Sequence, residues 1–209
     1  MSPVTPVAEV AATGSPLLTP GAAAAWFWGL MAVWVGSEVR LQLVADGDPA
    51  AGPDADRHSM PALIVGVWAA VGGGLALAEW VPPGRVPDPL SALLLAGGIL
   101  MVAGLALRWW AVRELGRHFT VRVRTTSDQE LVQTGPYRLL RHPGYAGALL
   151  TVAGCLLCCS DIASLSLFAL PAAAYWWRVA LEEKVLRQRF GPRYLEYAAR
   201  RKRLIPYLF

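Results

Sequence analysis

Charged residues are scarce in this 209-residue sequence, at 16%, whereas hydrophobic residues make up 55% of it. Together with a mean hydropathy of +0.41, this balance argues against ordinary soluble domains and indicates a membrane protein. Lys and Arg are absent from the first twenty residues, so we expect no signal peptide with a charged start. We expect this Pro-, Ala- and Thr-rich leader, residues 1–20, to be disordered.

Two further absences narrow the possible chemistry. No glycine-rich loop joins a strand to a helix, because the glycines at 72–74 lie inside an apolar run, and this excludes a soluble nucleotide-binding fold of the Rossmann type. Cysteine is limited to Cys155, Cys158 and Cys159, all within another apolar run. Since Leu and Ala around them offer no further ligands or polar support, we expect no metal site and interpret the cysteines as packing residues.

Long apolar runs are plentiful, and about 20 apolar helical residues suffice to cross a membrane. The apolar windows cover 22–44, 61–81, 89–107 and 144–181. The last window is too long for one span, so we divide it at Ser160-Asp161 into a helical hairpin whose second helix is kinked at Pro171. The sequence therefore predicts an all-α integral membrane protein with about five transmembrane helices.

Basic residues are unevenly distributed along the chain. The connection 108–142 holds seven Arg, and the tail after the last span is also basic, whereas the connection 45–60 holds four Asp and one Arg. Because Lys and Arg are retained on the cytoplasmic side, we expect both basic segments in the cytoplasm, the N-terminus outside, and the acidic connection accessible from outside. The basic segments match no nucleic-acid-binding module, so membrane lipids, with anionic headgroups, are the expected partners instead of nucleic acid.

The residue composition divides the chain into a scaffold and a candidate catalytic half. Residues 21–107 are plain spans, which predicts a three-helix membrane scaffold. Residues 108–209 concentrate His, Arg, Tyr and Glu together with Pro/Gly turns. We therefore expect any chemistry in 108–209, on the cytoplasmic side.

Four ordered blocks carry the candidate chemistry. They are Leu131-Val132 with Gly135-x-Tyr137, Arg141-His142-Pro143-x-Tyr145-x-Gly147, Arg178-x-x-x-Glu182-Glu183-x-x-Leu186, and Phe190-Gly191-x-x-Tyr194-x-x-Tyr197. In this order, separated by a membrane hairpin, they resemble the isoprenylcysteine carboxyl methyltransferase family, which is similar to the membrane phospholipid methyltransferases. The resemblance covers roughly residues 104–206. It implies an S-adenosylmethionine-dependent methyltransferase whose cofactor pocket is built from loops and helix ends at the membrane surface.

The resemblance also implies roles for individual residues. The residues expected around the cofactor's adenosine, or in the same loop, are Leu131, Val132, Gly135, Tyr137, His142, Pro143 and Tyr145. The resemblance places Glu182 and Glu183 against the cofactor and Arg178 toward the substrate, with Arg178 and Glu183 as catalytic candidates. Gln129, also a cofactor-binding candidate, stands where the family usually has a His. Glutamine forms hydrogen bonds but does not titrate near neutral pH, which puts a proton-transfer role there in doubt.

Residue chemistry alone leaves simpler interpretations open. Pro143 suits the first turn of a helix and His142 would then point off its end, without any catalytic role. Arg178 and Glu182 are four residues apart on a helix, which is the spacing of a structural salt bridge. Ionisable residues at membrane depth nevertheless favour a function, and a guanidinium can hold a carboxylate through two parallel hydrogen bonds.

The leading prediction is O-methylation of the carboxylate of a prenylated or otherwise lipophilic substrate that reaches the site through the bilayer. The alternatives are methylation of a phospholipid amine or a thiol, reduction of isoprenoid or sterol double bonds by a membrane NADPH-dependent reductase, and a silent scaffold. The pair Glu182-Glu183 favours a methyltransferase over the reductase. An amine acceptor would need a base, for which His142 and the two glutamates are the candidates.

Overall fold

The computed structural model describes residues 21–45, 58–80, 90–116, 130–159 and 162–205, together with Leu17 and Phe119. In chain order the elements are α1 (Ala22–Ala45), α2 (Ser59–Trp80), α3 (Leu90–Leu115), the 3-10 helix η4 (Gly135–Arg138), α4 (Pro143–Cys158), α5 (Ile162–Ser166), α6 (Ala169–Phe190) and α7 (Pro192–Arg200). Among these residues the only β pairing is an isolated parallel bridge between Leu140 and Lys202.

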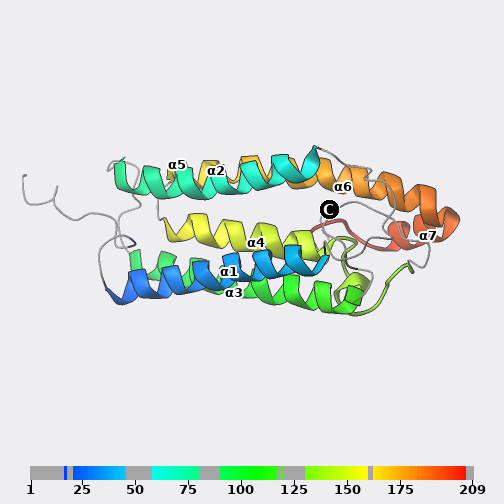
Figure 1. Ribbon diagram of the computed structural model, residues 1–209, viewed down its shortest axis with the longest axis horizontal. Helices are drawn as coiled ribbons and strands as arrows, with labels where there is room; N and C mark the ends of the chain where they lie inside the picture. Colours follow the sequence, from blue (N-terminus) through cyan, green and yellow to red (C-terminus); the bar gives the residue numbers. More distant parts are fainter. Residues whose placement is uncertain are drawn as a thin grey trace, which may run out of the picture.

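The long helices run along one common axis (Figure 1). In that view α4 lies between α2 and the neighbouring pair α1 and α3, and it contacts both α2 and α3. The upper layer is formed by α2 packed against α5 and α6. The short helix α7 folds against α6 at the end where α3 ends and α4 begins. The end of α3, the start of α4 and the helix α7 are thereby gathered at one end of the bundle, which we call the polar end.

Three helices, α1, α2 and α3, are long and apolar enough to cross a membrane, and α4 is a shorter apolar helix of 16 residues. The chain is thus an all-α integral membrane protein, as predicted. The hairpin boundary predicted at 160–161 falls between the end of α4 at Cys158 and the start of α5 at Ile162. A total of five spans, with α4 and the α5–α6 segment as the last two, stays a prediction.

Pro171 does not kink a continuous fifth helix, contrary to the sequence-based expectation. The break comes earlier, because α5 ends at Ser166 and α6 begins at Ala169. Pro171 is buried within the first turn of α6. At that position its missing N–H would have had no partner in the helix anyway, so a proline is tolerated there without a kink.

The helices α3 and α4 approach each other closely along glycines. A Cβ atom at Gly104 would lie 2.5 Å from the carbonyl oxygen of Gly147, and one at Gly154 would lie 2.5 Å from the carbonyl oxygen of Gly97. Small residues at such crossings let helix backbones touch, which is how membrane helices gain packing energy without a hydrophobic driving force. The seam fixes the start of α4 against the last turns of α3.

The three cysteines lie in the apolar core, as predicted for packing residues. Cys155, Cys158 and Cys159 are buried and free of disulfides. They belong to the main cluster of buried side chains, which also includes Phe27 of α1 and Met101 of α3. Their role is therefore to fill space between α4 and its neighbours.

One topological expectation is contradicted by the described flanks of the acidic connection 45–60, which lie at the same end of the bundle as the basic segments and not opposite to them. Glu38, near the end of α1, pairs with Arg108 near the end of α3, and Ser59, at the start of α2, bonds Arg178 of α6. Both ends of the connection thus lie at the polar end, since consecutive antiparallel helices return the chain to it. The error arose from its aspartates, because acidic residues contribute little to membrane orientation.

Candidate active site at the polar end

The start of α4 presents His142 as the sequence predicted. Pro143 occupies the first turn of α4, and His142 precedes it with a non-helical backbone (φ −128°, ψ 59°). The carbonyl of His142 accepts hydrogen bonds from the backbone N–H groups of Tyr145 and Ala146. The imidazole is buried, so the helix end holds it inside the protein.

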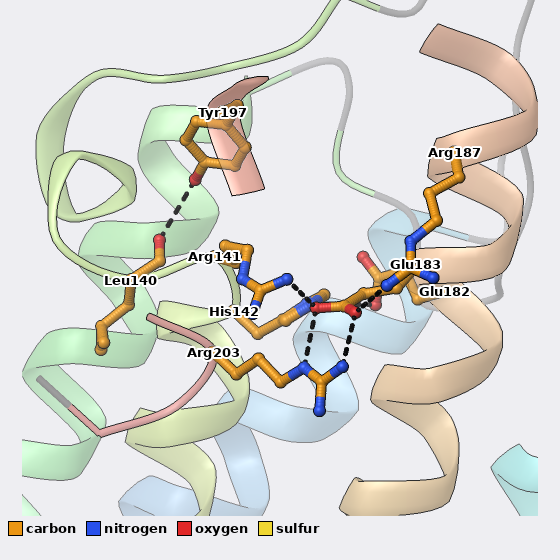
Figure 2. A network of polar contacts seen from close by, with 8 residues as sticks. All are labelled: Leu140, Arg141, His142, Glu182, Glu183, Arg187, Tyr197 and Arg203. Atoms are coloured by element: carbon orange, nitrogen blue, oxygen red, sulfur yellow. Dashed lines mark hydrogen bonds and ion pairs between the residues drawn. The ribbon is translucent and has the colours of Figure 1, made fainter. Parts of the chain in front are cut away.

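Residues 201–205, which we call the C-terminal strap, bind the segment 141–142 just before α4. The N–H of Arg141 donates to the carbonyl of Lys202 at 2.7 Å, and that of His142 donates to the carbonyl of Arg203 at 3.1 Å. The hydroxyl of Tyr197, from α7, donates to the carbonyl of Tyr137 at 2.9 Å. The same hydroxyl lies 3.3 Å from the carbonyl of Leu140, a contact drawn in Figure 2. Segments some sixty residues apart in sequence are therefore joined at the site.

Glu183 lies at the centre of a cluster of cations (Figure 2). Its side chain is 2% exposed, and its carboxylate pairs with Arg141 at 2.6 Å, Arg187 at 3.1 Å and Arg203 at 3.2 Å. The Nε2 atom of His142 lies 3.5 Å from the same carboxylate. Each oxygen of Glu183 is thus occupied by the protein's own arginines.

The electrostatics of this cluster keep Glu183 ionised. Burial by itself would raise the pKa of Glu183, but the contact with His142, the charge of Arg141 and the hydrogen bonds from Arg203 outweigh it and lower the pKa from 4.5 to about 2. Charged partners at hydrogen-bonding distance favour the charged form of a carboxyl. At neutral pH the residue is therefore a fixed anion, suited to hold three guanidinium groups in place.

The neighbouring Glu182 has a different environment. Its side chain is 30% exposed, and its Oε2 atom lies 3.7 Å from Nδ1 of His142. Within the part of the chain that the structure describes, this buried oxygen has no hydrogen-bond partner, and neither do Nε2 of His142 and Nε of Arg141. Buried polar atoms without partners are rare, because each costs desolvation energy. One free acceptor and two nitrogens therefore lie together beside the start of α4.

Arg178 lies on the apolar side of this cluster, one helical turn before Glu182. It is 2% exposed, and it donates from Nε to the hydroxyl of Tyr145 and from Nη1 to the hydroxyl of Ser59, both at 3.0 Å. The ring of Tyr145 stacks on His142 at 5.7 Å and also packs against Tyr175. Tyr145 therefore connects the polar cluster to Arg178.

The loop before α4 carries the remaining predicted residues. Leu131 and Val132 are half-buried in an irregular segment, and Tyr137 is buried in η4. Gly135 has a positive φ of 54°, a backbone conformation that favours glycine, and it lies beside the carboxylate of Glu114. Gln129 lies outside the described residues.

The structure brings most of the predicted residues together and adds others that the sequence did not indicate. The predicted residues that meet at the start of α4 are His142, Pro143, Tyr145, Arg178, Glu182 and Glu183. The added residues are Glu38, Ser59, Arg108, Tyr175, Arg187 and Arg203, while Arg141, which already stands in the second sequence block, is now placed against Glu183. Only Arg187 had a usable signal, its position four residues after Glu183 on one helix. Ser59 and Glu38 come from helices that carry no motif.

Comparison with known proteins agrees with this geometry. The family model described as phospholipid methyltransferase matches residues 92–193, just under half of the chain. A probable protein-S-isoprenylcysteine O-methyltransferase of Oryza sativa subsp. indica is 32% identical over 115 residues, which are 54% of this chain and 60% of that protein. Protein-S-isoprenylcysteine O-methyltransferase B of Arabidopsis thaliana is 31% identical over 115 residues, 54% of this chain and 58% of that protein. These matches confirm the resemblance to the isoprenylcysteine carboxyl methyltransferase family.

The likeness to the isoprenylcysteine carboxyl methyltransferases extends to the fold. The structure of the eukaryotic intramembrane Ras methyltransferase isoprenylcysteine carboxyl methyltransferase superposes with a TM-score of 0.66 at 22% identity, over 92% of this chain and 70% of that one. The likeness in fold to that structure therefore extends to the first helices of this chain, in which the sequence carried no motif. The chain spans about 60% of the length of the curated plant relatives that it matches.

Proposed function

We propose that this chain is an integral membrane methyltransferase that uses S-adenosylmethionine to O-methylate the carboxylate of a prenylated or other lipophilic substrate. The observation that carries the proposal is the cluster at the start of α4, where Glu182 and His142 have buried polar atoms without partners among the described residues and Arg178 lies nearby, bonded to Tyr145. The names of the plant relatives support the same reaction class.

The polar atoms of this cluster fit the proposed cofactor. S-adenosylmethionine carries an ammonium group and ribose hydroxyls, which need acceptors, and a carboxylate, which needs donors. Glu182 offers the free acceptor, while His142 and Arg141 offer nitrogens. We infer that these three residues hold the cofactor, with Tyr137 and the segment 131–132 beside them. The bound cofactor supplies an electrophilic methyl group.

Arg178 is placed to orient the acceptor. Hydrogen bonds from Nε to Tyr145 and from Nη1 to Ser59 fix the plane of its guanidinium. A guanidinium held in this way can align a carboxylate, and a carboxylate arrives charged and needs no general base. Because Arg178 belongs to an apolar part of α6, we infer that the substrate reaches it through the bilayer.

We also infer the orientation in the membrane from the distribution of Arg. Five spans, an outer N-terminus and a cytoplasmic polar end, in the cell's inner or plasma membrane, would place the segment 108–142 inside, as the positive-inside rule requires. Single cysteines introduced into 46–57 and into 117–129 should then react with an impermeant maleimide only after permeabilisation. Labelling of either segment in intact cells would overturn this orientation.

We also infer separate roles for the two halves of the chain. Residues 21–107 form most of the scaffold and 108–209 carry most of the site, after the leader 1–20. The scaffold nevertheless contributes Ser59 of α2 to Arg178. We therefore expect the C-terminal half to depend on α1 and α2 for a working site.

A phospholipid amine is the second candidate acceptor, because the matching family model is described as phospholipid methyltransferase. An amine must lose a proton before attack, for which His142 and Glu182 are the available bases. Detergent-purified protein should be tested for binding of radiolabelled S-adenosylmethionine against NADPH, and then for methyl transfer to a prenylcysteine and to phosphatidylethanolamine. Binding of NADPH alone would refute both methyltransferase readings, and methylation of the amine alone would replace the carboxylate by the phospholipid.

A further inference from the structure

An ion pair joins the first helix to the third near the start of α4. Arg108 of α3 binds both carboxylate oxygens of Glu38 of α1, with Nη2 2.6 Å from Oε2. The side chains are 12% and 27% exposed, respectively. Neither residue belongs to the four sequence blocks that carry the proposed chemistry. The pair is therefore a feature of this bundle that the proposed function does not use.

Arg108 also contacts α4 itself. Its third nitrogen, Nη1, donates to the carbonyl of Gly144 at 3.2 Å. The backbones are close here, since a Cβ atom at Gly147 would lie 2.7 Å from the backbone nitrogen of Arg108. Glu38 thus holds one edge of the guanidinium while the other edge holds the first turn of α4.

That first turn determines where Tyr145 lies. Gly144 is followed directly by Tyr145, whose hydroxyl accepts the hydrogen bond from Nε of Arg178. Arg108 is also near enough to Tyr145 and Tyr175 to interact electrostatically with both. A shift of the turn would move the Tyr145 hydroxyl away from Arg178, and small displacements of reacting groups lower rates strongly.

We propose that Arg108, held in place by Glu38, is a positioning residue that sets the first turn of α4 and thereby the contact between Tyr145 and Arg178. This inference rests on the proposed function for its effect on turnover. Ionised groups at this depth are costly to bury, and the bond to Gly144 gives Arg108 a role that an ion pair between α1 and α3 alone would not need.

Exchanging the two charges separates positioning from simple support. The double variant Glu38→Arg with Arg108→Glu keeps an ion pair between α1 and α3, but a glutamate at 108 cannot donate to the carbonyl of Gly144. We expect the double variant to recover most of the melting temperature lost by Arg108→Glu alone, while turnover stays at least tenfold below the original chain and cofactor affinity stays within about twofold. Recovery of both melting temperature and turnover would overturn the proposal.

A second variant decides the matter if the double variant does not fold. Arg108→Lys keeps the charge beside Glu38 but cannot bind Glu38 and Gly144 with one planar group. It should lower kcat for the acceptor without changing cofactor affinity, whereas Arg113→Ala, at an exposed position further along α3, should change neither. A Lys variant with unchanged kcat would overturn the proposal.

Amide hydrogen exchange tests the positioning without any turnover. In Arg108→Lys the amides of residues 145–148, at the start of α4, should exchange faster than in the original chain, and Arg113→Ala should not change them. Failure of the original chain to bind S-adenosylmethionine would refute the proposed function and leave this measurement valid. Unchanged exchange at the start of α4 would refute the role of Arg108.

Discussion

The substitution Glu183→Gln tests whether the cation cluster at the polar end stabilises the protein. Glutamine keeps the size of the side chain but removes the charge that Arg141, Arg187 and Arg203 share. A pKa held at about 2 instead of 4.5 corresponds to roughly 3 kcal/mol of stabilisation of the ionised form. Removing one partner of a buried ion pair costs about 3–5 kcal/mol, so both considerations give the same size of effect.

The expected result is a clear loss of thermal stability. A loss of about 3 kcal/mol lowers the melting temperature of a chain of this length by roughly 6–12 °C, measured by thermal unfolding in detergent at pH 7. Glu196→Gln is the matched control, because Glu196 pairs with Arg200 at a site where both side chains are 70% exposed. Exposed pairs of this kind contribute little. Equal melting temperatures for the two variants would refute the reasoning about Glu183.

The stabilisation that Glu183 contributes should depend on pH, and the direction of this dependence is defined. The pKa of Glu183 is lower in the folded protein than its ordinary value of 4.5, so its contribution is fully present above about pH 4.5 and is lost as the pH falls toward about 2. The melting temperature of the original chain should therefore approach that of Glu183→Gln within this window. A difference that stays constant from pH 6 to pH 3 would contradict the ionised state assigned to Glu183.

Three further predictions concern the cofactor, the acceptor and the packing. Glu182→Gln should weaken S-adenosylmethionine binding by roughly 10- to 150-fold, which is the range for one charged hydrogen bond. The melting temperature should change little. Calorimetry showing unchanged affinity would remove Glu182 from the site. Arg178→Lys should lower methyl transfer to a prenylcysteine while cofactor affinity holds, and a Lys variant with full turnover would end the assignment of Arg178 to the acceptor. Gly147→Ala should lower the melting temperature, because its Cβ atom would lie 2.6 Å from the carbonyl of Gly104, whereas Gly29→Ala, with nothing within 4 Å, should not.

The helical elements of the site could be predicted because their signals are local. Pro143 favours a helix start wherever it occurs, and the break between α6 and α7 at Gly191 follows from Gly191-Pro192, the glycine having a φ of 53°. The apolar windows predicted α1, α2 and α3 because the bilayer requires a minimum apolar length. Pro171 was misplaced because periodicity does not reveal a short helix such as α5 before it.

The pairing of Glu183 with Arg141 and Arg203 could not be predicted, because it depends on tertiary contacts. Arg203 reaches Glu183 only after α7 and the C-terminal strap fold back onto residues 141–142. The same limit applies to Ser59, which lies 119 residues before Arg178 in the chain. Family resemblance predicted that Glu182 and Glu183 share one site, but not that the protein's own arginines occupy Glu183.

Glu182 and Glu183 have different surroundings, and these surroundings suit them to different roles in the proposed site. Successive residues on a helix point about 100° apart, so Glu182 and Glu183 approach His142 from different sides and have different further partners. Glu183 faces the C-terminal strap, where it holds Arg141 and Arg203, and Glu182 faces His142 with an oxygen that has no protein partner among the described residues. A carboxylate that already neutralises several guanidinium groups has little capacity left for a cationic ligand, whereas a carboxylate with a free oxygen gains a hydrogen bond when the ligand arrives. Glu183 is therefore better suited to hold the site together and Glu182 to bind the cofactor.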